Sequence, residues 1–203
     1  MAPVGSGTVD PEVRYAPGMD GNGPFLWLSE YAPPAGFKNV PSGGMCVSAF
    51  VFVKRGKKIL LGKIRPHPDW ERLAGLDGER QERHGKGYNI PSRQLKFGED
   101  PLHAARHIGE KILAIPNIRC TGPRVEVEHW QLGDLASGPP ERKVLWHYDI
   151  WFLFDAEVPS SLEIKTPPWF RELEWHDPEQ VAKSAYTRGH EDVVARWMQP
   201  QRA

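Results

Sequence analysis

The sequence lacks most features that mark secreted or membrane-inserted proteins. Its 203 residues include two cysteines, Cys46 and Cys120, which are too few for a disulfide framework. Cys46 lies between two apolar residues, and we expect both cysteines to be plain buried thiols. The N-terminus has no apolar run of the signal-peptide type, and no apolar stretch approaches membrane-spanning length. These absences predict a cytoplasmic protein that does not associate with membranes.

An overall excess of either charge is also lacking. Lys plus Arg equals Asp plus Glu at 26 each, so no net field would draw the chain to nucleic acid or to a membrane. The charge is nevertheless uneven, because residues 54–86 contain ten Lys or Arg against five Asp or Glu. This local excess of five positive charges could serve phosphate binding, or it could form a solvated basic face.

The first 24 residues contain few apolar side chains. They include five Gly and four Pro, a composition typical of a flexible arm. Residues 25–203 have a length that suits one domain. Phe25, Leu26, Trp27 and Leu28 form an apolar patch directly after the arm. We expect this patch to pack on the domain or on a second copy of it, as in a homodimer.

Several apolar segments predict the strands of a sheet. Residues 46–53 have apolar side chains on both faces, which is typical of a central strand, and residues 59–63 return as its hairpin partner. Alternation predicts further strands at residues 124–130, 144–154 and 172–175. With helices at residues 100–114 and near the C-terminus, this order predicts an α+β fold with a mixed sheet.

Residues 65–86 separate the hairpin from the segment that follows. Their Pro, Gly and charged content predicts a surface insertion, with a helical turn near residues 70–74. His67 and Trp70 are its candidates for contact with a ligand. A solvated histidine and a partly buried tryptophan anchor are the alternatives.

Residues 90–115 form a loop followed by a helix. Pro91 and Gly98 interrupt the loop, and Asp100 and Pro101 suit the N-cap and the first helical position. Helical spacing predicts a buried stripe of Leu102, Ala105, Gly109 and Ile112. The opposite side would hold Glu99, His103, Arg106, His107, Glu110 and Lys111.

This loop and helix resemble the signature of the Nudix hydrolase superfamily. The family's box runs Gly, five residues, Glu, seven residues, Arg-Glu, an aliphatic, any residue, Glu-Glu, any residue, Gly and an aliphatic. The positions that agree with typical members, or nearly agree, are Pro91, Leu95, Phe97, Gly98, Glu99, Asp100, Pro101, Ala104, Ala105 and Arg106. The resemblance implies an α/β/α sandwich over about residues 44–185. It also implies box glutamates that hold Mg²⁺ or Mn²⁺ against a pyrophosphate.

The second half of the box departs from that pattern. Counted without gaps from Glu99, the departures are Arg93 for the opening Gly, His107 and Ile108 for Arg-Glu, Gly109 for the aliphatic, Lys111 and Ile112 for Glu-Glu, and Ala114 for the last Gly. A shift of one residue would bring Glu110 and Lys111 onto the glutamate pair and restore a single carboxylate.

Four residues are candidate metal ligands, namely Glu99, His103, His107 and Glu110. Their intervals of four, four and three residues place them roughly on one helical face. Two histidines and a carboxylate could ligate a transition metal, whereas Mg²⁺ prefers more oxygen donors. A hydrated face of mixed charge is the alternative. The resemblance also gives Glu99 a role in bracing the loop against the helix.

Candidates for catalysis lie on the helix and outside it. Glu110 would support any residual hydrolysis. His147 lies two residues from Asp149, so both side chains share one face of a strand. In some divergent Nudix enzymes that cleave GDP-sugars at carbon, the box glutamates are incomplete and a histidine outside the box is the general base. His147 or His67 could take that role, since a histidine titrates near neutral pH; a hydrogen-bonded pair at a strand edge is the alternative.

Two cations occupy box positions that are not basic in typical members. Arg93 and Lys111 stand where those members have Gly and Glu, so they could bind a diphosphate directly. Alternatively, they form salt bridges with Glu99 and Glu110.

Two functions remain compatible with the sequence. In the first, the chain is a divergent Nudix-fold protein that binds a nucleoside-diphosphate-linked ligand, with Mg²⁺-dependent pyrophosphate hydrolysis weak or lost. In the second, it hydrolyses a nucleoside diphosphate derivative, for example a nucleotide sugar, with a rearranged set of metal ligands and base. The missing glutamates favour the first, while the usual activity of the family favours the second. RNA is an alternative partner for a binding module.

Overall fold

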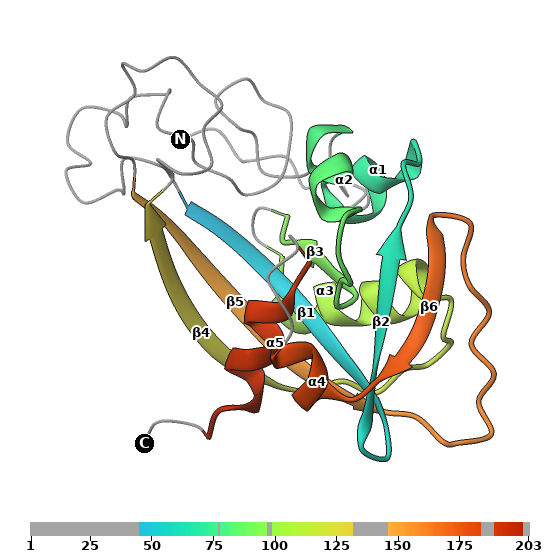
Figure 1. Ribbon diagram of the computed structural model, residues 1–203. Coiled ribbons are helices and arrows are strands. Elements are labelled where there is room, and N and C mark those ends of the chain that lie inside the picture. The colour runs from blue at the N-terminus through green and yellow to red at the C-terminus, as the bar shows by residue number, and fades with distance from the viewer. Residues whose placement is uncertain (1–44, 77, 97–98, 132–145, 184–188, 201–203) are drawn as a thin grey trace, which may run out of the picture.

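The computed structural model describes residues 45–76, 78–96, 99–131, 146–183 and 189–200. The arm predicted at residues 1–24 and the apolar patch at residues 25–28 lie outside these ranges, so both stay predictions. Figure 1 shows the described elements around a twisted sheet.

Strands and short helices alternate along the chain. The strands are β1 (Met45–Arg55), β2 (Lys58–Ile64), β3 (Ser92–Gln94), β4 (Thr121–Gln131), β5 (Trp146–Glu157) and β6 (Phe170–His176). The helices are α1 (Asp69–Ala74), α2 (Gly78–His84), α3 (Pro101–His107), α4 (Pro178–Ala182) and α5 (Glu191–Met198), with a π-helical turn, η1 (Ile108–Ile112), directly after α3.

The six strands form one mixed sheet, in which five follow the order β4-β5-β1-β2-β6 and β3 pairs with β1 outside that order. β1 and β5 pair in parallel, with Ser48 opposite Trp151, and the other pairs are antiparallel. The pairs between β1 and β2 are Lys54 with Ile59 and Arg55 with Lys58, at the hairpin end. β3 pairs with the other half of β1 and brings Arg93 opposite Ala49. This pairing places the loop before α3 beside the centre of the sheet.

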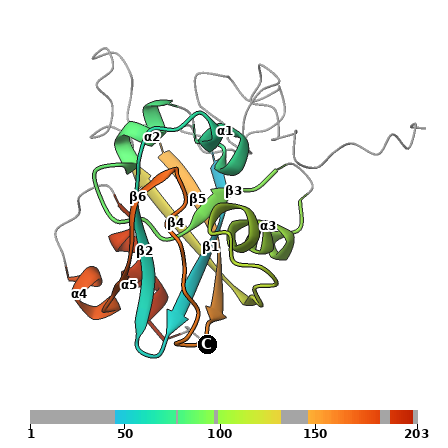
Figure 2. The same cartoon turned by 90° about the vertical axis from the view of Figure 1, so that its right-hand side faces the viewer.

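Helices cover both faces of the sheet, as Figure 2 shows with α3 on one side and α4 and α5 on the other. Side chains of β1 alternate between two buried clusters. Val51 and Val53 point into the cluster that includes residues of α1, α3 and η1. Phe50 and Phe52 point into the cluster that includes residues of α4 and α5. The predicted α+β class, with a mixed sheet in an α/β/α sandwich, is therefore confirmed.

The insertion at residues 65–86 is not purely a surface excursion. α1 confirms the helical turn predicted near residues 70–74, and α2 follows it without a sequence prediction. Trp70, Leu73 and Ala74 are buried in the same cluster as α3. The insertion therefore closes one end of the core, and its polar side faces outward.

Candidate functional site

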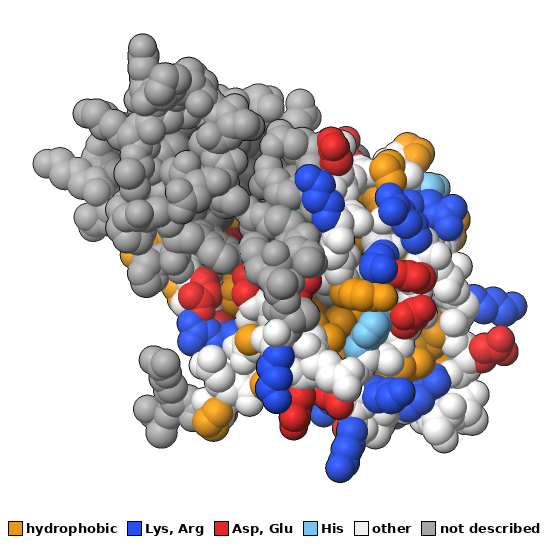
Figure 3. Space-filling model, viewed as in Figure 1, with side chains coloured by type: hydrophobic (Ala, Val, Ile, Leu, Met, Phe, Trp, Pro, Cys, Tyr) orange, Lys and Arg blue, Asp and Glu red, His pale blue; other side chains and the backbone are white. Residues whose placement is uncertain are grey.

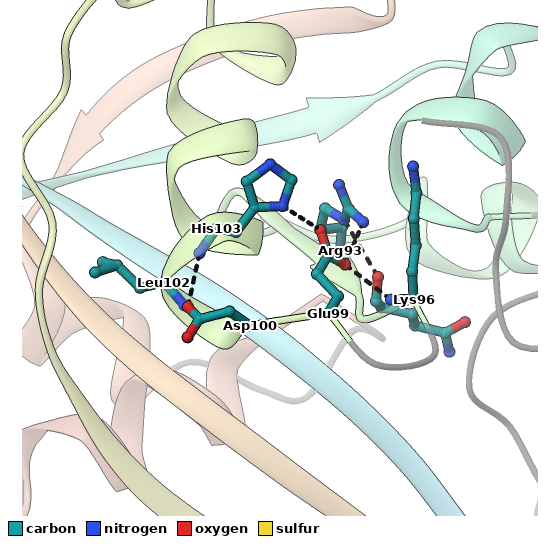
Figure 4. Close-up of polar contacts among 7 residues, drawn as sticks. Arg93, Lys96, Glu99, Asp100, Leu102 and His103 are labelled. Carbon is teal, nitrogen blue, oxygen red and sulfur yellow. Dashed lines mark hydrogen bonds and ion pairs between the residues drawn. The ribbon is translucent and has the colours of Figure 1, made fainter. Parts of the chain in front are cut away.

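The N-terminus of α3 is fixed as its sequence predicts. The Asp100 carboxylate accepts hydrogen bonds from the backbone N–H groups of Leu102 (2.7 Å) and His103 (3.1 Å), and Pro101 occupies the first turn. Two donors that the helix leaves unpaired are thereby satisfied. The cap sets the position of Glu99, which directly precedes it (Figure 4).

Glu99 fastens the loop to the helix. Its Oε2 accepts from the Arg93 guanidinium at 2.6 Å and from the Lys96 backbone N–H at 2.8 Å. Its Oε1 lies 3.0 Å from Nδ1 of His103 (Figure 4). The side chains of Arg93 and Glu99 are 0% and 5% exposed, so this ion pair is buried. These contacts agree with the bracing role that the resemblance implies for Glu99.

The buried pair changes the interpretation of Arg93. A ligand in solvent could reach this guanidinium only by displacing the residues that cover it, because its side chain has no exposed area. Of the two alternatives for Arg93, the structure therefore gives the salt bridge with Glu99 and not a diphosphate-binding surface.

The four candidate metal ligands do not come together. Glu99 contacts His103, whereas His107 is buried and Glu110 is exposed on η1. Among the described residues, no group of three or more His, Cys, Asp or Glu could hold a metal ion. Both Glu99 oxygens are already occupied by Arg93, the Lys96 N–H and His103. The donors present therefore do not fit Mg²⁺, which prefers about six oxygens.

His107 lies on the buried side of the helix, and its predicted place on the solvated side is wrong. Burial lowers the pKa of His107 to about 3, and the positive charges of Arg93 and Lys96 act in the same direction. A hydrogen bond with the Leu73 backbone acts in the opposite direction. His107 is therefore a neutral imidazole between α3 and α1 at physiological pH.

This depressed pKa predicts a pH-dependent loss of stability. The unfolded chain binds a proton at His107 below its ordinary pKa of about 6.5, and the folded chain does not until about pH 3. Stability contributed by neutral His107 is thus complete above pH 6.5 and declines as the pH falls towards 3. Between pH 8 and pH 5 we expect the free energy of unfolding to fall by about 2 kcal/mol more in the wild type than in His107→Leu.

Urea denaturation of both proteins at the two pH values measures this difference. His190, whose pKa burial also lowers to about 3, is present in both proteins and cancels in the comparison. An equal pH dependence in the two proteins would mean that His107 is accessible to protons in the folded state.

The end of the helix predicted at residues 100–114 is not α-helical. The Leu113 N–H donates to the carbonyl of Ile108 at 3.0 Å, and η1 replaces the last turn of the predicted helix. Gly109 lies against Ile118, where an added Cβ would be 2.1 Å from the Ile118 Cγ2 atom. The missing side chain lets the helix approach the segment that leads into β4. Ile108 and Ile112 are both 0% exposed in the core.

The backbone at Ala114 distinguishes the two ways of counting the sequence against the Nudix signature. Ala114 has φ +55°, the left-handed conformation that favours glycine. The ungapped count places the last Gly of the box at this residue. The alternative one-residue shift would place that Gly at Leu113, whose φ of −96° suits any residue. The geometry agrees with the ungapped count, which puts Ile108, Lys111 and Ile112 where the resemblance implies glutamates.

Replacing Ala114 by glycine is expected to stabilise the protein. An L-residue in the left-handed region costs about 1–2 kcal/mol, and glycine removes most of that cost while it adds some flexibility to the unfolded chain. We expect Ala114→Gly to raise the free energy of unfolding by about 0.5–1 kcal/mol in urea denaturation. Asn117 also has a positive φ, of +54°, and Asn117→Gly should change stability less, because asparagine tolerates this region.

Trp70 is an anchor and does not face a ligand site. It is 2% exposed, its indole N–H donates to the Arg65 carbonyl at 2.9 Å, and its ring packs edge-on against Phe170. The Nδ1 atom of His67 accepts from the Asp69 N–H at 3.2 Å, at the start of α1. The structure therefore supports the anchor alternative for Trp70 and gives His67 a local structural contact.

Three other candidates keep their predicted roles as predictions. Glu110 and Lys111 are exposed on η1, where a ligand could reach them. His147 belongs to β5 and pairs with Trp130 of β4, but its side chain lies outside the described part of the structure. Asp149, its neighbour on the strand, is half-buried.

Three cations that the sequence did not single out line a cavity. Lys63 of β2 and Arg171 of β6 face a cavity of about 500 Å³ together with Lys86, which follows α2. The excess of positive charge in residues 54–86 was the available signal for Lys63 and Lys86. No local signal marked Arg171, because it reaches this place through the pairing of β6 with β2.

In the part of the chain that the structure describes, no helix is long and apolar enough to cross a membrane.

The similarity of this chain to known proteins was found among solved structures. No family model matches the sequence, and no curated protein matches it. The chain is similar to the MutT protein from Methanosarcina mazei Go1, with 14% identity, a TM-score of 0.47, and coverage of 80% of this chain and 99% of that chain. It is similar to the dihydroneopterin triphosphate pyrophosphohydrolase of E. coli, with 14% identity, a TM-score of 0.45, and coverage of 74% and 93%.

A third similar structure is the MutT NUDIX hydrolase from Burkholderia pseudomallei, with 16% identity and a TM-score of 0.42. The matched region covers 76% of this chain and 98% of that chain. At these identities the likeness extends to the fold alone.

Proposed function

We propose that the protein binds a ligand built on a nucleoside diphosphate and hydrolyses it weakly or not at all by the metal-dependent route of the Nudix family. The observation that supports this function is the occupancy of the box glutamate positions. Ile108 and Ile112 are buried in the core there, and Lys111 places a cation on the surface. No three-carboxylate cluster can form on this helix.

The absence of a carboxylate cluster that could hold a metal favours binding over hydrolysis. Cleavage of a pyrophosphate by the family's route needs a metal held by carboxylates, a positioned water, and cations for the charge that develops in the transition state. Cations alone bind the ground state and the transition state similarly, which favours affinity without turnover. Lys111 on η1 and the basic residues of the 65–86 insertion provide such cations.

A second candidate function rests on the exposed Glu110. This carboxylate projects from η1 into solvent and is the exposed acidic residue of that turn. In this alternative the protein is a hydrolase of a nucleoside diphosphate derivative with a rearranged site, and Glu110 supports it. His147 would then be the general base.

A panel assay separates the two functions. ADP, UDP, GDP and their monophosphates are titrated into the full chain by calorimetry, and a short RNA is titrated in parallel. Hydrolysis of ADP-ribose, a nucleotide sugar, nucleoside triphosphates and dinucleoside polyphosphates is followed with Mg²⁺, Mn²⁺ and Zn²⁺. We expect diphosphates to bind more tightly than monophosphates, and turnover to stay below about 0.01 s⁻¹, a thousandth of a typical enzyme's.

Glu110→Gln is the informative variant in the same panel. Slow turnover that disappears in Glu110→Gln would support the rearranged hydrolase. Brisk Mg²⁺-dependent turnover that survives this change would overturn the proposal, since the chemistry would then lie on another element. Binding of RNA without binding of any diphosphate would overturn both candidates.

A further inference from the structure

Three cations are among the residues that line the cavity between the insertion and the sheet edge. Its walls come from β2 (Lys63), from α2 and the turn after it (Gln81, Glu82, Gly85, Lys86) and from β6 (Arg171). Its volume of about 500 Å³ falls within the range of small-ligand sites. We call it the basic pocket. Figure 3 shows Lys and Arg side chains, with some carboxylates among them, gathered over this side of the molecule.

Arg171 reaches the basic pocket because of a β-bulge. Ile64 pairs with Phe170 and Lys63 pairs with Glu172, so Arg171 is an extra residue on β6 opposite this step. A bulge interrupts the alternation of a strand and redirects a side chain. It places Arg171 in the lining while its neighbour Phe170 stays buried, at 1% exposure.

Lys63 is held in place by two contacts. Its Nζ lies 2.7 Å from Oε1 of Glu172 and 4.4 Å from the centre of the Tyr88 ring. The hydrogen bond with Glu172 raises the pKa of Lys63, so the ammonium stays charged. Lys86 and Arg171 are exposed, and Glu82 is the acidic residue of the lining. The lining therefore has three cations and one anion, and one of the cations, Lys63, is paired with Glu172 behind it.

Hydrogen bonds hold the wall formed by α2. Gln81 is 7% exposed, and its amide accepts from the His67 N–H at 2.9 Å and donates to the Leu76 carbonyl at 2.8 Å. The Asn89 amide donates to the His84 carbonyl at 2.7 Å, at the end of the helix. These contacts join the middle and the C-terminal end of α2 to the segments before and after it. The cavity therefore does not depend on a ligand to hold its wall in position.

We propose that the basic pocket binds the diphosphate of the ligand, which makes it the anion subsite of the proposed function and rests on that function. Three cations from three elements can surround a group with several negative charges, and an arginine can donate two parallel hydrogen bonds to one phosphate. A single surface cation would not provide this geometry. Inorganic pyrophosphate and a nucleoside diphosphate share the chemistry that the basic pocket recognises.

The test compares charge changes inside and outside the basic pocket. The double variant Lys86→Ala with Arg171→Ala is matched by Lys57→Ala with Arg119→Ala, which removes the same charges from exposed positions. Lys57 lies in the turn between β1 and β2, at the opposite end of β2 from Lys63. Lys63 is left unchanged, because its pair with Glu172 joins two strands. Inorganic pyrophosphate, ADP and adenosine are titrated into each full-length protein by calorimetry.

We expect the double variant Lys86→Ala with Arg171→Ala to bind both pyrophosphate and ADP about tenfold or more weakly than the wild type, because two charge-assisted contacts are lost. The matched variant should change both affinities by less than about twofold at physiological salt. Glu82→Gln should strengthen both, because it removes the carboxylate of the lining. Adenosine should bind equally to all the variants, or to none.

Each outcome decides the assignment. Equal weakening in the pocket variant and the matched variant would show a general charge effect and overturn it. If the wild type, both double variants and Glu82→Gln all bind ADP with the same affinity, the assignment of the diphosphate to the basic pocket is wrong, while the proposed function stands. A wild-type protein that binds neither pyrophosphate nor ADP would overturn the proposed function, and this inference with it. Circular dichroism of each variant confirms that its fold is intact.

Discussion

Ile112→Glu is expected to lower the free energy of unfolding by about 4 kcal/mol or more at pH 7, whereas Lys111→Glu should change it by less than about 0.5 kcal/mol. The two changes introduce the same carboxylate at the two positions of the box's glutamate pair. Ile112 is 0% exposed within the cluster that joins the sheet to α3, and Lys111 is exposed. A carboxylate at residue 112 would have neither water nor a cation beside it in the core.

The pH dependence of the stability lost in Ile112→Glu tests whether a buried carboxylate causes the loss. Burial raises the pKa of a carboxyl group, so the glutamate at residue 112 would bind its proton at a higher pH in the folded state than in the unfolded state. The deficit of Ile112→Glu should therefore shrink as the pH falls from 7 to 5, while Ile112→Met should show a smaller deficit that does not depend on pH. Urea denaturation at both pH values measures these differences.

A stable Ile112→Glu protein that gained Mg²⁺-dependent hydrolysis would contradict both the burial of this position and the proposed function. It would mean that the box face of the helix can turn towards solvent. The combination Lys111→Glu with Ile112→Glu then becomes the decisive protein, because it restores the full glutamate pair. We expect it to be less stable than Lys111→Glu and equally inactive.

The sheet was predictable because its signals are local. The apolar side chains on both faces of residues 46–53 require cover on two sides, and β1 lies between β5 and β2 with a buried cluster on each face. The cap at Asp100 was predictable for the same reason, because an N-cap depends on residues within one turn. Periodicity and capping therefore gave the architecture before any long-range contact was known.

The site was less predictable because its geometry depends on contacts between distant residues. His107 was placed in solvent because the sequence did not show that α1 of the insertion covers this side of α3. The π-helical turn that follows α3 was not expected either. That turn accompanies the close approach of Gly109 to Ile118, for which no local pattern exists. Arg171 reaches the basic pocket through a bulge in the pairing of β2 with β6, which the sequence of β6 alone does not reveal.

Glu99→Ala is expected to cost about 3–5 kcal/mol of stability, because it leaves the Arg93 guanidinium buried opposite an empty position. It also removes the acceptor of the Lys96 N–H and the contact with His103. Asp100→Ala, which removes a cap at the adjacent residue, should cost only about 1 kcal/mol. The difference separates the buried ion pair from an ordinary effect on the start of the helix.

A double-mutant cycle isolates the ion pair. Arg93→Met and Glu99→Leu are each expected to be strongly destabilising, since each leaves one charge buried without its partner. The two changes together should cost at least 1 kcal/mol less than the sum of the separate costs, because no unpaired charge remains. Additive costs would show that Arg93 and Glu99 stabilise the loop through other neighbours.

The response to Mg²⁺ shows whether Glu99 is a structural clamp or a metal ligand. If Glu99 held Mg²⁺, millimolar Mg²⁺ would stabilise the folded wild type by mass action, and Glu99→Gln would abolish that stabilisation. If Glu99 is the clamp that its contacts describe, Mg²⁺ at 10 times physiological levels leaves the midpoint of unfolding unchanged in both proteins. Glu99→Gln then costs stability by itself, because the neutral amide cannot neutralise Arg93. A Mg²⁺-dependent rise in the wild-type midpoint that Glu99→Gln removes would make Glu99 a ligand and require an active metal site beside α3.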